Sequence, residues 1–114
     1  VTYGAAISAC EKGNRWEDAL ALLREMEEVG IKPNVTCYGA AISACGNCGQ
    51  WEQALTLLQE MPSHDVEPDV ICYNATLTAC EKGKEWKNVL GLLQEMIQKG
   101  IQPNEVTYNA AISA

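Results

Sequence analysis

The feature that most limits how this chain can fold is a repeat with a period of 35 residues. Residues 1–34 and 36–69 are identical at 17 of 34 positions, with no gap. The residues that recur one period apart are Tyr3, Tyr38, Tyr73 and Tyr108; Cys10, Cys45 and Cys80; Trp16, Trp51 and Trp86; Met26, Met61 and Met96; and Pro33, Pro68 and Pro103. Self-similarity at a period of about 20–50 residues indicates stacked units, each of which buries its apolar face against its neighbours.

Each period predicts two helices joined by a turn. In the first period, Tyr3, Ile7 and Cys10 recur at helical spacing, and the small residues between them permit close helix packing. A turn is expected at residues 13–15, where glycine and asparagine are adjacent. Three residues stand where the next first helix needs a side-chain cap: Asn34, Asp69 and Asn104.

A second helix is predicted over residues 16–29, with Gly30 as its C-cap and Pro33 blocking its continuation. Its apolar stripe consists of Trp16, Ala19, Leu20, Leu23 and Met26. The residues predicted to form its solvated face are Glu17, Asp18, Arg24, Glu25, Glu27 and Glu28. In the second period, Pro62 is expected to end this helix early and to leave a looser loop.

These elements predict an all-α fold, a right-handed α-solenoid of stacked helix-turn-helix repeats. The repeats occupy residues 1–34 (lacking the first residue of the period), 35–69 and 70–104, and residues 105–114 supply a fourth first helix. Because the sequence starts and stops inside a repeat, we expect it to be a piece of a longer array. It contains no apolar stretch long enough to span a membrane and no targeting segment.

The net charge of −7, from 8 basic and 15 acidic residues, argues against non-specific binding of polyanions. Taken alone it favours a protein partner or a solvated surface. Most acidic residues fall on the predicted second helices, whereas the first helices are nearly neutral. Composition therefore gives no support for a strongly basic binding groove.

The cysteines and the single histidine suggest no catalytic or metal site. Five of the six cysteines follow the repeat, and we expect them to be small buried apolar residues rather than disulfides. Cys45 and Cys48 form a C-x-x-C motif, but the sequence offers no second ligand pair nearby for zinc. His64 is expected to be exposed and inert, because no serine or cysteine is placed to use it. We predict no enzyme activity, no cofactor and no small-molecule substrate.

Several landmarks of the period match a known family. The matching stretches are Val106-Thr107-Tyr108-Asn109, Trp16-Glu17-Asp18-Ala19-Leu20, Glu25-Met26 and Gly30-Ile31-Lys32-Pro33-Asn34. With their 35-residue spacing they resemble the pentatricopeptide repeat, and the resemblance extends over the whole chain. The tetratricopeptide repeat fits less well, since its tryptophan lies early in the first helix.

The resemblance implies single-stranded RNA as the partner, with one base recognised per repeat by two or three side chains. The base-recognition pairs it implies are Gly4 with Asn34, Gly39 with Asp69, and Asn74 with Asn104, while Asn109 begins a fourth. The residues implied to clamp the bases are Val1, Thr36, Ile71 and Val106, and those implied to contact phosphate are Lys12 and Lys82. The family also implies a role in chloroplast or mitochondrial RNA processing, editing, stability or translation.

The chemistry of these side chains is compatible with those roles. Asp69 can accept a hydrogen bond from the imino N–H of U or G, whereas the amides of Asn34 and Asn104 can donate to a ring acceptor of C or A. The family pattern implies a pyrimidine, preferably C, for Asn74 with Asn104. Gly4 and Gly39 supply no recognition side chain. The caps would also serve any solenoid structurally, so a protein-binding or structural scaffold without RNA affinity remains the alternative.

Overall fold

The computed structural model describes residues 3–113, which form only helices and turns. The helices are α1 (Tyr3–Lys12), α2 (Trp16–Glu28), α3 (Val35–Asn47), α4 (Trp51–Glu60), the short 3-10 helix η1 (Met61–His64), α5 (Val70–Lys82), α6 (Trp86–Gln98) and α7 (Glu105–Ser113). The predicted all-α repeat fold is confirmed, and α2 ends one residue earlier than expected. None of the described helices has the length and apolarity needed to cross a membrane.

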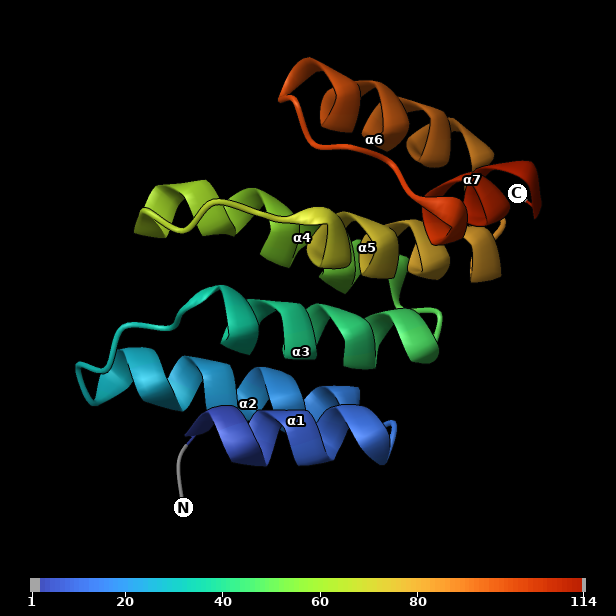
Figure 1. Cartoon of the computed structure of the whole chain (residues 1–114). Coiled ribbons are helices and arrows are strands. Elements are labelled where there is room, and N and C mark those ends of the chain that lie inside the picture. Colours follow the sequence, from blue (N-terminus) through green and yellow to red (C-terminus); the bar gives the residue numbers. More distant parts are fainter. Residues whose placement is uncertain (1–2, 114) are drawn as a thin grey trace.

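The helices stack in chain order along one direction, as Figure 1 shows. The first helices of the repeats, α1, α3, α5 and α7, form a continuous row in which each contacts the next. Each second helix packs on the first helix of its own repeat and on that of the following repeat. The row of first helices therefore presents one surface of its own, which we call the first-helix face.

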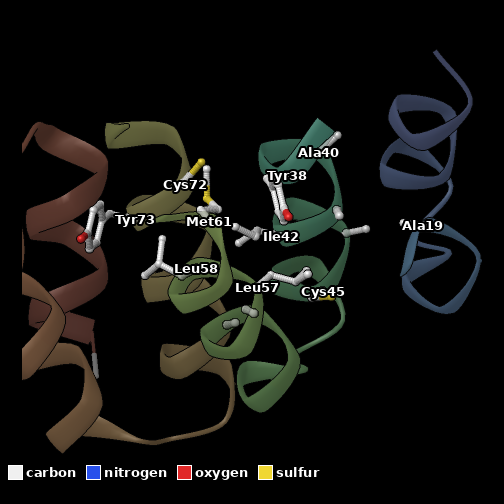
Figure 2. Close-up of a cluster of buried hydrophobic side chains, with 14 of the residues drawn as sticks. Ala19, Tyr38, Ala40, Ile42, Cys45, Leu57, Leu58, Met61, Cys72 and Tyr73 are labelled. Atoms are coloured by element: carbon white, nitrogen blue, oxygen red, sulfur yellow. The ribbon is translucent and has the colours of Figure 1, made fainter. Parts of the chain in front are cut away.

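The core lies where α3 passes between α1 and α5. Tyr38, Ile42 and Cys45 on α3 are fully buried, and Figure 2 shows Tyr38 and Ile42 beside side chains of the second repeat. Small residues are needed on this helix because its neighbours approach closely on both sides. A Cβ atom on Gly46 would lie 2.6 Å from the carbonyl oxygen of Ala75, so only glycine fits there.

The second helices end in the same hydrogen-bonded turn. After α2, Gly30 has a φ of 85°, and the Ile31 amide donates to the Met26 carbonyl at 2.9 Å. After α6, Gly100 has a φ of 77°. This is the Schellman arrangement, in which a residue in the left-handed region reverses the chain. The C-cap of α2 is Val29, and Gly30, which we predicted as the cap, is the next residue and turns the chain.

The irregular second repeat keeps this turn by different means. As expected from Pro62, α4 stops at Glu60, and η1 replaces its last turn. Asp65 then adopts a φ of 60°, and the Val66 amide donates to the Met61 carbonyl at 2.9 Å. The loop is therefore closed in the same way as those after α2 and α6, and the 35-residue register is preserved.

Candidate nucleic-acid interface

The third repeat brings its two predicted base-recognition residues together on the first-helix face. Asn74 lies in the second turn of α5, and Asn104 precedes α7. The Asn74 amide nitrogen donates to Asn104 Oδ1 at 3.0 Å. The cap predicted at Asn104 is confirmed, because the Thr107 amide donates to the same Oδ1 at 3.2 Å. Two residues 30 positions apart thus meet because consecutive first helices are adjacent.

Thr107 is a member of this site that the sequence analysis missed. Its side chain is fully buried, and its hydroxyl contacts the Asn74 side-chain oxygen. The Asn104 backbone amide donates to Thr107 Oγ1 at 3.1 Å. The signal that could have found Thr107 is its place three residues after a capping asparagine, where a reciprocal hydrogen bond is common.

A hollow of about 370 Å³ opens beside this pair, and we call it the third-repeat hollow. Its lining includes Asn74 and Asn104 together with the predicted clamps Ile71 and Val106. Ile71 is 60% exposed and Val106 is 53% exposed, so both present apolar surface to solvent. The hollow is therefore lined by both polar groups and exposed apolar side chains.

A similar hollow of about 220 Å³, the second-repeat hollow, lies one period earlier. Gly39 and Asp69 line it, as do the predicted clamps Thr36 and Ile71. Asp69 caps α5 by accepting from the Cys72 amide at 3.1 Å. Ile71 lines both hollows and so separates two adjacent compartments of the first-helix face.

The remaining predicted recognition residues, Gly4, Asn34 and Asn109, do not line either hollow. Asn34 is exposed and caps α3, accepting from the Cys37 amide at 2.9 Å. Gly4 lies on α1, where a Cβ atom would be 3.8 Å from Cys37 Sγ. Asn109 is exposed on α7, and the predicted clamp Val1 falls outside the described residues.

Charged groups near the hollows are few. Lys12 is exposed at the end of α1. Lys82 Nζ donates to the Asn47 carbonyl at 3.0 Å and so caps the end of α3. Glu11, which the sequence analysis did not assign to the site, lines both hollows. The first-helix face thus contains a carboxylate beside the two candidate compartments.

Family models cover the chain in three overlapping segments. They are described as the PPR repeat family over residues 1–47, the PPR repeat over 36–66 and the pentatricopeptide repeat domain over 56–114. The chain belongs to the pentatricopeptide repeat family. No curated protein sequence matches it.

Solved pentatricopeptide repeat structures share its fold. The protein PPR10 in complex with an 18-nt psaJ RNA element superposes with a TM-score of 0.86 at 28% identity over 96% of the chain. The PPR domain of Arabidopsis thaliana protein-only RNase P 1, in complex with tRNA, gives a TM-score of 0.78 at 20% identity over 94% of the chain. The chain spans 16% of the length of PPR10 and 55% of the RNase P 1 chain.

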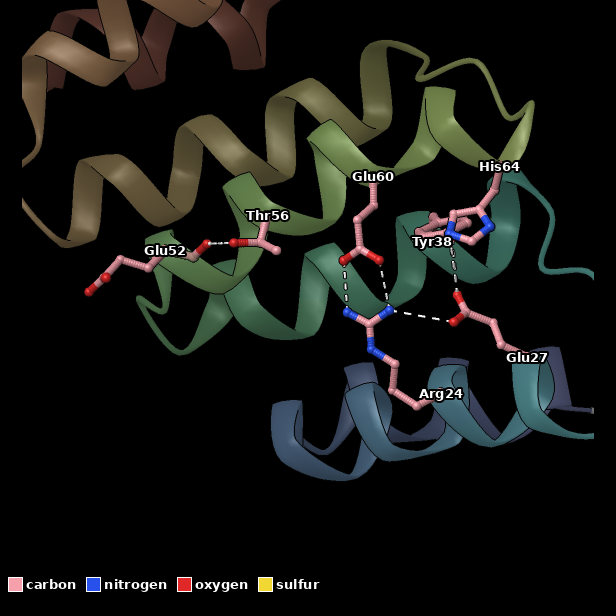
Figure 3. A network of polar contacts seen from close by, with 7 residues as sticks. All are labelled: Arg24, Glu27, Tyr38, Glu52, Thr56, Glu60 and His64. Atoms are coloured by element: carbon pink, nitrogen blue, oxygen red, sulfur yellow. Dashed lines mark hydrogen bonds and ion pairs between the residues drawn. The ribbon is translucent and has the colours of Figure 1, made fainter.

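The opposite layer of this pentatricopeptide array holds an ion-pair cluster between the first and second repeats (Figure 3). Arg24 on α2 donates to both carboxylate oxygens of Glu60 on α4, at 2.8 and 2.7 Å. The hydrogen bond from Arg24 lowers the pKa of Glu60. Tyr38 donates to Glu27 at 3.4 Å, and burial together with Glu27 raises the pKa of Tyr38 to about 12. Arg24 is exposed, as we expected for the solvated face, and Glu27 is half-buried, but their contacts with Glu60 and Tyr38 were not predicted.

The prediction for His64 needs a similar correction. Its side chain is half-buried, with the ring centroid 6.3 Å from that of Tyr38 and Nε2 3.9 Å from Glu27 Oε1. His64 is the last residue of η1, and its contact with Tyr38 on α3 could not be predicted from the sequence. Among the described residues, Glu27, Glu60 and His64 are the one group whose ligand atoms lie close enough to share a metal ion. Because Arg24 already binds both oxygens of Glu60, we assign this group to the contact between repeats.

The cysteines that follow the repeat are buried as predicted, except Cys10, which is half-buried. All six are free, and Cys37, Cys45, Cys72 and Cys80 are buried. Burial raises the pKa of Cys45 to about 12 and that of Cys80 to about 11. Buried thiols with raised pKa values are poor nucleophiles and poor metal ligands. Cys45 therefore serves the packing of α3, whereas Cys48 follows that helix and its Sγ donates to the Asn14 carbonyl at 3.2 Å.

Proposed function

We propose that this chain binds single-stranded RNA on its first-helix face, with successive bases in successive hollows. The observation that carries the proposal is the pair of adjacent hollows one repeat apart. Each contains a predicted recognition pair between two predicted clamps. Unpaired RNA bases are usually held against a flat side chain, most often an aromatic one, and hydrogen-bonded at their edges; here the exposed aliphatic clamps would supply the first contact and the recognition pairs the second.

The comparison with PPR10 supports this proposal. At 28% identity over 96% of the chain, the likeness extends beyond a shared fold, and that protein is seen bound to an 18-nt RNA element. The organellar role that the family implies, in processing, editing, stability or translation of transcripts, is part of the same proposal. That role is proposed for a whole protein, because this chain spans only 16% of the length of PPR10.

The three sites contribute unequally. In the third repeat, Asn74 and Asn104 supply two amides to one base. In the second, Asp69 supplies a carboxylate suited to the imino N–H of U or G, while Gly39 supplies no side chain. In the first, Gly4 likewise leaves Asn34 to act alone. We therefore assign most of the sequence selectivity to the third repeat.

The test is selection from a randomised single-stranded RNA pool at low salt. The chain should enrich a motif in which one base is strongly preferred, and Asn74→Ala should relax the preference at that base only. Gln94→Ala, which removes an exposed amide from α6 in the opposite layer, is the matched control and should leave the motif intact. Failure of the unaltered chain to enrich any motif would refute RNA recognition.

A protein-binding scaffold is the alternative, and the net charge of −7 favours it. Carboxylates repel phosphate, and Glu11 lies beside both hollows. The same selection separates the two functions. A scaffold would retain no RNA even at low ionic strength, where electrostatic attraction is greatest.

A further inference from the structure

We infer that Thr107 is a positioning residue that fixes the amide orientation of both Asn74 and Asn104, so that the third repeat presents hydrogen-bond donors to its base. This inference rests on the proposed RNA-binding function and assigns a selectivity role to a residue that contacts no base itself. It is carried by the closed set of hydrogen bonds among these three residues.

The orientation of Asn104 is set by a backbone group. The Thr107 amide lies 3.2 Å from Asn104 Oδ1. A backbone N–H can only donate, so the atom of Asn104 that faces it must be the oxygen. The amide nitrogen of Asn104 consequently points away from Thr107.

The orientation of Asn74 is held at both ends of its amide, by Asn104 and by the Thr107 hydroxyl. Because Asn104 Oδ1 is an acceptor, the Asn74 atom 3.0 Å from it must be the donor Nδ2. The other end of the Asn74 amide, Oδ1, then lies against the hydroxyl of Thr107. That hydroxyl accepts from the Asn104 backbone amide at 3.1 Å, and its single hydrogen has two acceptors within reach, Asn74 Oδ1 and, at 3.1 Å, Asn104 Oδ1. Because Asn104 Oδ1 already accepts from the Thr107 backbone amide and from Asn74, we assign the hydrogen to Asn74. Backbone N–H groups thus set the direction of Asn104 and of the hydroxyl, and the hydroxyl holds the oxygen of Asn74.

Most of the groups left for a ligand are donors, and they belong to two residues that line the third-repeat hollow. Both hydrogens of Asn104 Nδ2 and the second hydrogen of Asn74 Nδ2 remain outside the set, against one lone pair of Asn74 Oδ1. Cytosine offers two neighbouring acceptors, N3 and O2, to such a site. Uracil places an N–H donor at N3, which would meet another donor. Once a bound base shields these donors from water, a donor left without an acceptor is costly, and the fixed amide direction therefore favours cytosine.

The other two repeats lack this device. One and two periods before Thr107 stand Cys72 and Cys37, whose thiols are weak hydrogen-bonding groups. There Asp69 and Asn34 cap their helices by accepting a hydrogen bond from the backbone amide of the cysteine. Among the described repeats, a hydroxyl contact to a recognition residue on the preceding first helix is found at the third site, between Thr107 on α7 and Asn74 on α5.

The experiment measures binding of oligo(C) and oligo(U) RNA to the 114-residue chain by fluorescence anisotropy, which removes any dependence on register. The third repeat should favour oligo(C) by roughly tenfold, the value expected for one satisfied against one unsatisfied hydrogen bond, whereas Asp69 in the second repeat favours oligo(U) in every variant. The readout is therefore the change between variants: Thr107→Val should shift the ratio of the two dissociation constants by roughly tenfold towards oligo(U), and Thr107→Ser should keep the ratio of the unaltered chain. Thr107→Cys, the residue used in the other repeats, should behave like Thr107→Val.

Thr76→Val is the matched control. Thr76 is also fully buried, and its hydroxyl donates to the Cys72 carbonyl at 2.9 Å within α5. Its loss should lower stability without changing the base preference. If Thr107→Val and Thr107→Cys keep the ratio of the unaltered chain, or if Thr76→Val shifts it equally, the positioning role is refuted.

A second readout needs no RNA. In ¹H–¹⁵N spectra the side-chain amide of Asn74 should show slow solvent exchange, and in Thr107→Val it should exchange like an exposed asparagine. If oligo(C) and oligo(U) both fail to bind while the Asn74 amide responds in this way, the RNA proposal fails and the orientation device stands. An Asn74 amide that is unaffected by Thr107→Val overturns the device itself.

Discussion

The turn between the two helices of each repeat depends on a single residue with positive φ. These residues are Asn14 at 56°, Gly49 at 71° and Lys84 at 59°. In each case the next residue donates its amide to a carbonyl five positions earlier, as Glu85 does to Cys80 at 2.8 Å. Asparagine and glycine accept this conformation readily, whereas a lysine there is strained.

Lys84→Gly should therefore stabilise the chain. The left-handed conformation costs a lysine about 1–2 kcal/mol, and the added flexibility of glycine in the unfolded chain offsets part of the gain. We expect a net increase of about 0.5–1 kcal/mol in the free energy of unfolding, measured by urea denaturation. Gly49→Lys should lower it by a similar amount, and a stabilising Gly49→Lys would contradict the argument.

At this scale the sequence predicts what depends on neighbours in the chain. The caps at Asn34, Asp69 and Asn104 could be predicted because each side chain reaches an amide three residues away. The role of Thr107 could not, because its hydroxyl meets a residue 33 positions earlier. That contact exists only once α5 and α7 are stacked.

The packing of α3 against α5 requires a residue without a side chain at Gly46, where the two helices approach closely. Gly46→Ala should be strongly destabilising, because the added Cβ would lie 2.6 Å from a backbone oxygen that cannot rotate away. Overpacking of this kind costs about 2–3 kcal/mol. Gly91→Ala on α6 is the control: nothing lies within 4 Å of the new Cβ, so higher helix propensity should stabilise by about 0.5–1 kcal/mol. Chemical denaturation of both variants measures the difference, and a neutral Gly46→Ala would show that the helices separate easily.

The ion pair between α2 and α4 should make the contact between repeats sensitive to acid. Because Arg24 lowers the pKa of Glu60, the stabilisation is present above the unfolded-state pKa and is lost as the pH falls through the folded-state pKa. Glu60→Gln should lower the free energy of unfolding by about 1 kcal/mol at pH 7. The difference from the unaltered chain should shrink as the pH falls below about 4.5.

Glu95→Gln is the matched control for this pair, since Glu95 holds the same place one repeat later. It contacts Lys99 on its own side of the repeat boundary, at 3.6 Å. We expect its removal to have a smaller effect that does not depend on the first two repeats. Thermal unfolding at a series of pH values measures the stability of both variants. Equal pH dependence of Glu60→Gln and Glu95→Gln would argue against a contact between repeats.

At the level of elements, periodicity predicted the order and type of the described α-helices, but it gave a loose loop where the structure has the 3-10 helix η1. The cluster around Arg24 was missed because charged residues at surface spacing look alike whether they face water or the next repeat. Arg24 becomes glutamine in the next two periods, at Gln59 and Gln94. That break in an otherwise regular position was the available signal of a specific contact.

The molecule as a whole combines an RNA-binding architecture with a negative net charge, and this combination has a measurable consequence. On the first helices the basic residues are Lys12 and Lys82. Each phosphate neutralised on a single strand contributes about −0.7 to the slope of log K against log salt. We therefore expect a slope no steeper than about −1.4, which corresponds to a roughly sevenfold loss of affinity between about 50 and 200 mM salt.

Single substitutions measure how much each of the two lysines contributes to that slope. Lys12→Gln should reduce its magnitude by about 0.7. Lys82→Gln should reduce it less, because the ammonium group already donates to the Asn47 carbonyl. Lys99→Gln, which lies after α6 in the opposite layer, should leave it unchanged. Shallow salt dependence would mean that most of the affinity comes from stacking and base-edge hydrogen bonds in the hollows. A slope several times steeper would mean that phosphates are bound away from the first-helix face, and that the hollows are not the principal site.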